Sequence, residues 1–291
     1  MTGAKLLLDT SSVKQEVAPE PFLKWAGGKT QLLGQLDRFF PGQFKTYYEP
    51  FVGSAAAFFH LRRTRTWFPA WLADSNAELV NCYQVVRDKV QTLIPLLKNH
   101  QREHGKHYYY NIRGQNPEAL TKVQRAARLI YLNKTCYNGL HRVNAKGEFN
   151  VPMGSYSNPR IVDEETLKAA SKALRDTAFY VGDFSAVLDT AVPNDLIYFD
   201  PPYYTEGNGF TGYSVSASGK NVFRAEEHRR LLEVAKDLSA RDCHVVISNS
   251  DMEYIRRLYK GFNIHVVHAR RAINSNGNGR GAVTELIITN R

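Results

Sequence analysis

Short apolar and aromatic runs alternate with helical patterns at both ends of the chain, and this alternation predicts an α/β fold. Each run has the length of a buried strand and is bounded by turn residues. A helix is predicted over residues 55–61, after a glycine turn that follows the first run. The pattern indicates a doubly wound sheet with helices on both faces. The predicted strands are residues 46–49, 71–73, 179–181, 196–199, 245–248 and 285–289.

The middle of the chain, from about residue 77 to 142, has a helical pattern instead. Its apolar residues recur at the spacing of one helix face. One such stripe runs from Val123 to Tyr131. We expect Arg125 and Arg128 on the opposite side of that helix.

A hairpin turn is predicted at residues 144–147, within the segment 140–156. The helical middle and this hairpin together form a predicted insertion into one sheet-containing domain. The predicted division is residues 1–20 as a disordered N-terminal extension, 21–75 and 165–291 as the main domain, 76–164 as the insertion, and 274–281 as a Gly/Asn/Ser-rich loop.

The composition sets outer limits on the class of protein. A chain of 291 residues, 43% of them hydrophobic, is long enough for one large domain with a smaller insertion. No apolar run approaches the roughly 20 residues that a membrane span needs, so no membrane segment is expected. Cys82, Cys136 and Cys243 are far apart and form no Cys-x-x-Cys pair, which predicts neither disulfides nor a zinc site. These features favour a reducing cytoplasm.

Positive charge is concentrated in the predicted insertion. Residues 76–164 contain 13 Lys and Arg against 7 Asp and Glu, so they carry +6 of the net +10. Charge alone favours a merely solvated surface. Aromatic and amide side chains are interleaved with the basic ones, however, and this combination favours nucleic acid, whose phosphates attract lysine and arginine.

The most informative motif is Asp200-Pro201-Pro202-Tyr203, directly after the predicted strand 196–199. Open α/β sheets bind ligands at the carboxyl ends of their strands. Proline fixes φ and has no N–H, so the two rings set the backbone direction, and the Pro201 carbonyl is predicted to point outward. The Asp200 carboxylate, this carbonyl and the Tyr203 ring suit a planar group that bears an NH2, such as a nucleobase. The same residues also suit an ordinary turn.

Two glycine-containing motifs precede this one. Residues 22–29 read Phe-Leu-Lys-Trp-Ala-Gly-Gly-Lys, and residues 48–54 read Tyr-Glu-Pro-Phe-Val-Gly-Ser. The first has some likeness to a phosphate-binding loop, but Leu23 stands where that motif requires glycine, which disfavours a nucleotide triphosphatase. The second predicts a tight turn between a strand and a helix.

With these three motifs in this order, the chain from about Pro21 to its C-terminus resembles the Dam-type DNA adenine-N6 methyltransferases of the D12 class. The resemblance implies a Rossmann-like methyltransferase sheet that uses S-adenosyl-L-methionine (AdoMet). Residues 21–75 and 165–291 would be the catalytic domain, and 76–164 the target-recognition domain. The implied cofactor-binding residues are Trp25, Ala26, Gly27, Lys29, Glu49, Pro50, Phe51, Gly53, Ser54, Asp74, Asp183, Phe184 and Asp200.

Two of these carboxylates have implied roles in holding the cofactor. Asp74 ends a predicted strand about twenty residues after the first turn, where it can accept hydrogen bonds from both ribose hydroxyls. It also suits an N-cap of the following helix. By resemblance, Asp183 accepts from the cofactor's adenine amino group, with Phe184 against the ring. For Trp25, packing in the core is the alternative role.

Residues 133–142, followed by 146–152, are similar to the DNA-reading hairpin of the same family. The resemblance implies that Arg142 reads a guanine edge, where a guanidinium can bond O6 and N7 together. Tyr137 and Asn138 would fill the gap left by a displaced adenine. The implied DNA-binding residues are these three with Lys24 at the outer guanine, Leu140 and Pro152 at neighbouring bases, and Lys134 at a phosphate.

The resulting hypothesis is a bacterial or phage cytoplasmic enzyme that methylates adenine N6 in double-stranded DNA, within GATC, after base flipping. The catalytic residues would be Asp200, Pro201, Pro202 and Tyr203. We expect a monomer, with no metal, membrane or obligate protein partner. Cytosine N4 or RNA adenine remains an alternative target, because the motif recognises an NH2 group. A catalytically inactive DNA-binding protein is a further alternative, which intact Asp200, Tyr203 and Lys29 disfavour. A role in restriction-modification, repair, replication timing or a phage is left open.

Overall fold

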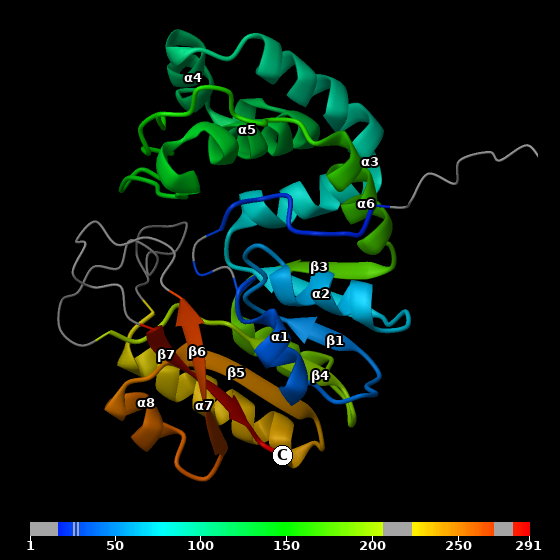
Figure 1. The fold of residues 1–291 in the computed structure, drawn as a ribbon, viewed down its shortest axis with the longest axis vertical. Coiled ribbons are helices and arrows are strands. Elements are labelled where there is room, and N and C mark those ends of the chain that lie inside the picture. The colour runs from blue at the N-terminus through cyan, green and yellow to red at the C-terminus, as the bar shows by residue number, and fades with distance from the viewer. Residues whose placement is uncertain (1–16, 26, 28, 206–222, 271–281) are drawn as a thin grey trace, which may run out of the picture.

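The computed structural model describes residues 17–25, 27, 29–205, 223–270 and 282–291. Its centre is one seven-stranded sheet with the strand order β3-β2-β1-β4-β5-β7-β6 (Figure 1). Strands β1 to β5 run parallel, and β7 is antiparallel to both of its neighbours. The strands are β1 (Tyr47–Glu49), β2 (Ala70–Asp74), β3 (Thr177–Val181), β4 (Leu196–Phe199), β5 (His244–Ser250), β6 (Asn263–Arg270) and β7 (Ala282–Thr289).

The predicted α/β fold is confirmed, and all six predicted strands are present. The sheet is mixed, because β7 runs against β5 and β6. Strand β6 is absent from the predicted set. Its polar residues Asn263, His265 and His268 interrupt the apolar pattern, and as an edge strand it pairs with β7 alone. Polar residues of this kind are usual on a strand that is only partly covered.

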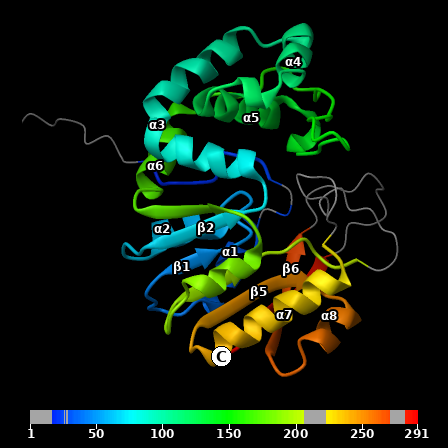
Figure 2. The same cartoon turned by 180° about the vertical axis from the view of Figure 1, so that it is seen from behind.

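Alternating side chains along the strands build two hydrophobic cores, one on each face of the sheet. Tyr47 and Tyr198 point into the first core, whereas their neighbours Tyr48 and Phe199 point into the second. Burial of each large apolar side chain stabilises the fold by roughly 1.5–3 kcal/mol. The first face carries α1 (Leu33–Leu36), η1 (Asp37–Phe39), α2 (Ala56–Thr64) and α6 (Glu164–Ala173), and the second carries η4 (Phe184–Asp189), α7 (Ala225–Ala240) and α8 (Glu253–Leu258), as Figures 1 and 2 show from opposite sides.

A helical layer lies beyond the β3 edge of the sheet (Figure 1). The predicted domain boundary at residue 76 falls on Asn76, the N-cap of the long helix α3. The first half of α3 still packs on the sheet, where Tyr83 stacks on Phe179 with ring centroids 6.1 Å apart. The backbone leaves helical geometry at Lys89, inside α3. The layer consists of α3 (Ala77–Arg102), α4 (Lys106–Arg113), η2 (Pro117–Ala119), α5 (Lys122–Thr135) and η3 (Tyr137–Gly139).

The predicted placement of Arg128 on the polar side of α5 is wrong. Its side chain is only 7% exposed, and its guanidinium donates to the carbonyls of Ile112 and Arg113, at 2.9 and 2.7 Å. These carbonyls lie in the last turn of α4, where the regular i→i−4 bonds of the helix end, and the Ile112 carbonyl also accepts from the Gln115 N–H at 3.3 Å. Arg125 pairs with Glu78 of α3. Both arginines therefore join helices of the layer together.

Some predictions fall outside the described residues, namely most of the N-terminal extension (1–16) and the predicted loop 274–281. Residues 17–20 are described and have no regular secondary structure. Among the helices that the structure describes, none is long and apolar enough to cross a membrane.

Candidate active site

Four predicted site segments meet at one edge of the sheet. The segment 49–54 starts with the last residue of β1, and Asp74 is the last residue of β2. Asp183 lies two residues after β3, and Asp200 directly follows β4. These strands are parallel and adjacent in the order β3-β2-β1-β4, so their carboxyl ends lie side by side. The chain connections diverge between β1 and β4, and ligands bind in the crevice at such a switch point.

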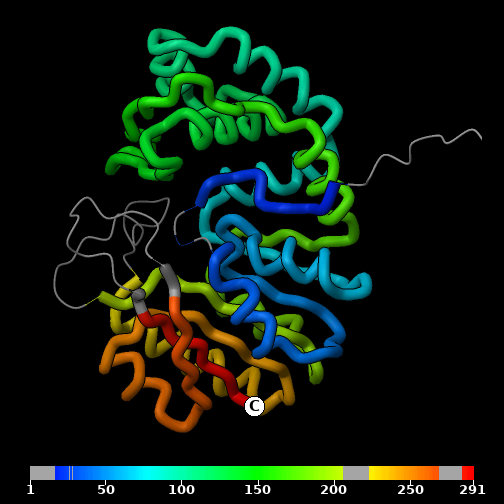
Figure 3. The backbone as a smooth tube through the Cα atoms, in the orientation of Figure 1, coloured from blue at the N-terminus to red at the C-terminus, as the bar shows by residue number. Residues whose placement is uncertain are grey.

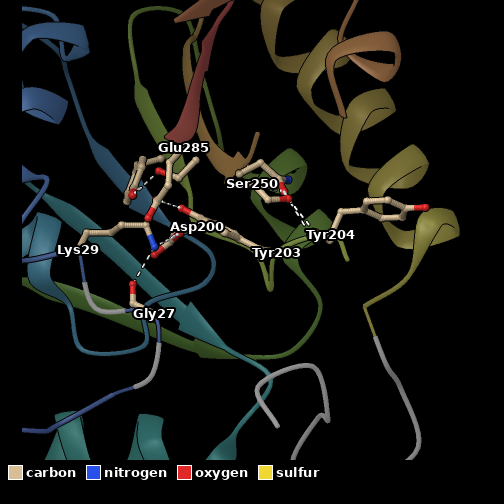
Figure 4. A network of polar contacts seen from close by, with 10 residues as sticks. Gly27, Lys29, Asp200, Tyr203, Tyr204, Ser250 and Glu285 are labelled. Atoms are coloured by element: carbon tan, nitrogen blue, oxygen red, sulfur yellow. Dashed lines mark hydrogen bonds and ion pairs between the residues drawn. The ribbon is translucent and has the colours of Figure 1, made fainter. Parts of the chain in front are cut away.

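Asp200 and Lys29 form a buried ion pair at this point. The Lys29 Nζ lies 2.9 Å from Oδ1 of Asp200 and also donates to the Gly27 carbonyl at 2.7 Å (Figure 4). The two side chains are 19% and 7% exposed, for Asp200 and Lys29 respectively. Burial raises the pKa of Asp200 to about 6, and the Lys29 ammonium opposes that rise.

Tyr203 is fixed at both its ring and its hydroxyl. The hydroxyl donates to Oε2 of Glu285 at 2.6 Å, and the Lys29 Nζ lies 4.6 Å from the ring centroid (Figure 4). Burial, with the nearby charges of Asp200 and Glu285, raises the pKa of Tyr203 well above its usual range. The phenol is therefore neutral, with its direction set by β7.

The residue after the motif is clamped to the end of β5. The Tyr204 N–H donates to Oδ1 of Asn249 at 3.3 Å, and its carbonyl accepts from the Ser250 hydroxyl at 2.7 Å (Figure 4). Within the described part of the chain, no donor forms a hydrogen bond with the Pro201 carbonyl. The motif is thus held on both sides, and among the described residues the Pro201 carbonyl has no hydrogen-bond donor.

The turn after β1 depends on glycine and on Asp74. Gly53 has φ +46°, and a Cβ there would lie 3.0 Å from Cδ1 of Trp25. Asp74 accepts from the Gly53 N–H at 3.3 Å and from the Asn76 N–H at 2.9 Å, through different oxygens. Burial raises the pKa of Asp74 to about 6. The N-cap of α3 is Asn76, so the alternative role of Asp74 as helix cap is wrong.

Glu49 is a second buried carboxyl group near Asp200. It is 2% exposed and accepts from the Tyr47 hydroxyl at 2.9 Å. Burial and the charge of Asp200 raise the pKa of Glu49 well above its usual range. The remaining residues of this turn lie close by: Pro50 and Ser54 are buried, and Phe51 stacks on Phe184 with centroids 5.4 Å apart.

Asp183 already has protein partners. Its Oδ1 accepts from the backbone and hydroxyl of Ser185, at 3.0 and 2.7 Å, and from Arg230 at 2.9 Å. The implied contact between Asp183 and the amino group of the cofactor stays a prediction. Because Oδ1 already has these partners, the contact would use Oδ2 of Asp183. Ala26 lies outside the described residues.

The predicted recognition segment forms a turn-rich loop below α5. The Tyr137 N–H donates to the Pro152 carbonyl at 2.9 Å, and the chain doubles back through the predicted turn, where the Asn144 carbonyl accepts from Gly147 at 2.9 Å. Tyr137, Asn138, Arg142 and Pro152 are exposed, and Leu140 is half-buried.

Arg142 and two lysines differ in their surroundings. Arg142 donates through Nε to Oδ1 of Asn150 at 2.7 Å and through Nη2 to the Asn150 carbonyl at 3.4 Å. Lys24 is exposed, with its Nζ 4.5 Å from the Tyr156 ring centroid. Lys134 is half-buried, and burial beside Lys24 lowers the pKa of its ammonium.

Comparison with known proteins decides the family. Residues 25–273 match the model of the D12 class N6 adenine-specific DNA methyltransferases. The chain belongs to this family. The type II methyltransferase M1.LlaDCHI of Lactococcus lactis subsp. cremoris is 39% identical over 285 residues, 95% of this chain and 97% of that protein. The type II methyltransferase M.MjaIII of Methanocaldococcus jannaschii is 40% identical, over 93% and 99% of the two chains. The DNA adenine methylase of Escherichia coli K12 is 34% identical, over 91% and 93%.

This D12 methyltransferase acts on adenine in DNA and uses AdoMet. The described residues fit the cofactor at the turn after β1. The Asp74 carboxylate has about four acceptor positions, and the backbone N–H groups of Gly53, Asn76 and Ser75 use at most three, which leaves capacity for a ribose hydroxyl. Among the described residues, no group of three His, Cys, Asp or Glu side chains is arranged to hold a metal ion.

The sequence reasoning missed three residues of this D12 site, namely Asn249, Ser250 and Glu285. Asn249 and Ser250 stand at the carboxyl end of β5, so the rule that located Asp200 would also have found them. Glu285 gives no such signal, because β7 is antiparallel and brings its N-terminal half to this edge.

The raised pKa of Asp200 predicts pH-dependent catalysis. If the ionised Asp200 carboxylate accepts hydrogen bonds from the target amino group, the single-turnover methylation rate at saturating AdoMet should be half its maximum near pH 6 and should fall further at lower pH. Lys29→Met should move this midpoint to higher pH, because Lys29 lowers the pKa. Rates measured from about pH 5 to about pH 8 test both expectations. A flat profile, or a midpoint unmoved by Lys29→Met, would contradict them.

Asp74→Ala should weaken AdoMet binding without changing DNA sequence preference. Hydrogen bonds to a charged group contribute about 1.5–3 kcal/mol, so we expect roughly a tenfold to hundredfold loss. Calorimetry gives the dissociation constant. Asn76→Ala is the matched control, since it removes the α3 cap, at a cost of about 1 kcal/mol in stability, but spares the Gly53 contact. If the dissociation constant for AdoMet is unchanged in Asp74→Ala, the Asp74 carboxylate has a structural role only.

Proposed function

We propose that this D12 enzyme methylates N6 of the adenine in GATC after swinging that nucleotide out of the duplex. The observation that carries the proposal is the arrangement of Asp200, Pro201 and Tyr203 at the switch point of the sheet. A carboxylate, an available carbonyl and an aromatic ring converge there. Together they suit the two hydrogens and the flat face of an aminopurine.

AdoMet supplies an electrophilic methyl group bound to a sulfonium. The protein's part is alignment and exclusion of water. The lone pair of adenine N6 is delocalised into the ring, so the amino group must be gripped while it pyramidalises. Asp200 and the Pro201 carbonyl accept its hydrogens and stabilise the positive charge that develops. Tyr203 stacks on the base, with its hydroxyl fixed by Glu285.

Base flipping follows from where the target atom lies. N6 is inside the duplex, whereas Asp200 is largely buried in the sheet edge. Extruding a nucleotide costs about a few kcal/mol, and side chains that enter the gap offset part of that cost. Tyr137, 53% exposed, and Asn138 are the proposed occupants of the gap.

Specificity for GATC is proposed from Arg142 and from the resemblance of its hairpin to Dam-type enzymes. Asn150 engages Nε and one Nη2 hydrogen of Arg142. Nη1 and the second Nη2 hydrogen form the other edge of the guanidinium, which suits O6 and N7 of a guanine. Digestion of treated DNA with methylation-sensitive and methylation-dependent nucleases tests the site directly. Protection at sites other than GATC would refute this specificity and leave adenine methylation intact.

Asp200→Ala should lower the single-turnover rate by roughly 10²–10³, because it removes one preorganised acceptor. AdoMet and DNA dissociation constants, measured on the same preparation, should stay within a few-fold of wild type. Those two constants are the control for folding. A near-normal rate would show that Asp200 is not the acceptor.

Arg142→Ala should reduce discrimination at one guanine position. A bidentate arginine contact contributes about 1–3 kcal/mol of discrimination, whereas a phosphate contact affects all sequences alike. Lys134→Ala is the matched comparison, and it should lower affinity uniformly and flatten the salt slope by about one unit. Methylation rates on every single-base variant of GATC, at fixed salt, separate the two roles. Equal slowing at all sites in Arg142→Ala would assign Arg142 to the backbone.

A further inference from the structure

His228 is a fully buried histidine in the first turn of α7. Its Nδ1 lies 3.4 Å from Nδ2 of Asn249, at the carboxyl end of β5. Its ring meets the ring of Tyr204 edge to face, with centroids 5.8 Å apart. Figures 2 and 3 show the start of α7, in yellow, beside the chain that leaves β4. His228 therefore lies next to the residue that follows the Asp-Pro-Pro-Tyr motif.

Two backbone donors determine how the Asn249 amide is turned. Its Oδ1 accepts from the N–H groups of Ser250 and Tyr204, at 2.9 and 3.3 Å. A backbone N–H can only donate, so the oxygen of the amide must face these two groups. The Nδ2 hydrogens then face His228, whose Nδ1 must accept. With the amide turned over, Nδ2 would face both N–H groups and Tyr204 would lose its acceptor.

The imidazole of His228 can accept at Nδ1 only in the neutral form that carries its proton on Nε2. Burial lowers the pKa of His228 to about 4, so the neutral form is present at neutral pH. Within the part of the chain that the structure describes, Nε2 has no hydrogen-bond partner, and the contact with Asn249 is the one polar bond of the ring. A leucine would pack there with no polar atom to satisfy. The contact with Asn249 therefore explains why this buried side chain is polar.

We propose that His228 is a positioning residue for methyl transfer, which fixes the Asn249 amide so that Asn249 holds the Tyr204 N–H and the motif before it. The inference rests on the proposed role of this motif as the acceptor of the adenine amino group. Asp200 stands four residues before Tyr204, and the two prolines between them restrict the backbone. A displacement of Tyr204 is therefore passed on to the Asp200 carboxylate and the Tyr203 ring. Methyl transfer requires aligned reacting atoms, so this displacement slows the chemical step.

His228→Leu tests the inference, because it removes the Nδ1 acceptor and keeps an apolar side chain in the core. On a duplex that the wild-type protein methylates, the single-turnover rate should fall by roughly 10- to 100-fold. The dissociation constants of AdoMet and DNA should stay within a few-fold of wild type.

His228→Asn is the conservative variant. Its amide oxygen lies the same number of bonds from the backbone as Nδ1, so this variant should keep most of the wild-type rate. Its smaller side chain leaves a cavity, so thermal unfolding should show it to be less stable than His228→Leu. The two variants should therefore rank in opposite orders for rate and for stability. Rates that follow stability would overturn the inference.

Val234→Ala is the matched control for lost packing. Val234 is buried in the same core, further along α7, and its side chain has no polar atom. This variant should lose thermal stability and keep a rate within a few-fold of wild type. If His228→Leu does not fold, His228→Gln takes its place, since its amide oxygen lies one bond further from the backbone than Nδ1 and the rate should fall as well.

A double-mutant cycle shows whether His228 acts through Asn249. Asn249→Ala removes the acceptor for the Tyr204 N–H itself, so adding His228→Leu to it should lower the rate little further. If the two losses multiply, the residues act independently and the inference is wrong.

Asp200→Ala in the same assay separates this inference from the proposed function. A near-normal rate in Asp200→Ala would remove the proposed role of the motif, and the role of His228 with it. A large loss in Asp200→Ala together with a near-normal rate in His228→Leu would overturn the role of His228 alone.

Discussion

The ion pair between Asp200 and Lys29 is the interaction on which the active site depends. Removing both charges from water costs several kcal/mol per ion, so the pair is retained only where its geometry is good and further bonds satisfy it. Lys29 meets that condition through the Gly27 carbonyl and the face of Tyr203. One ammonium thereby contacts the Asp200 carboxylate, the Gly27 carbonyl and the face of the Tyr203 ring. Loss of either charge would leave the other uncompensated in the crevice.

Strand direction explains why these parts meet. Four parallel strands bring the turns after β1, β2, β3 and β4 to one edge, and the chain connections diverge between β1 and β4. The antiparallel β7 adds Glu285 from its own first half, since it enters the sheet from the opposite direction. If β7 were parallel to its neighbours, its first half, with Glu285, would lie at the opposite edge of the sheet. The antiparallel direction of β7 therefore places this carboxylate beside the site.

Strand direction also determines which residues of the site could be predicted from the sequence. Asp200, Asp74 and the turn after β1 follow directly from strands that end in polar residues. The clamp on Tyr204 follows from the same rule applied to β5. Glu285 does not, because the direction of a strand cannot be read from its apolar pattern. Arg128 was misplaced for a related reason: helical periodicity finds the most apolar face of α5 but not the second face that α4 covers.

The buried arginines also change the meaning of the charge on the insertion. Arg128 and Arg125 are engaged within the helical layer, so they are not placed to neutralise phosphates. The salt dependence of DNA binding reflects only the phosphates that the protein neutralises, and it should be weaker than the formal charge of the insertion indicates. The proposed specificity therefore rests on oriented groups such as Arg142 rather than on total charge. Arg142 stands next to His141, whose ring stacks on Trp25, and Trp25 in turn lies against Gly53 in the turn after β1.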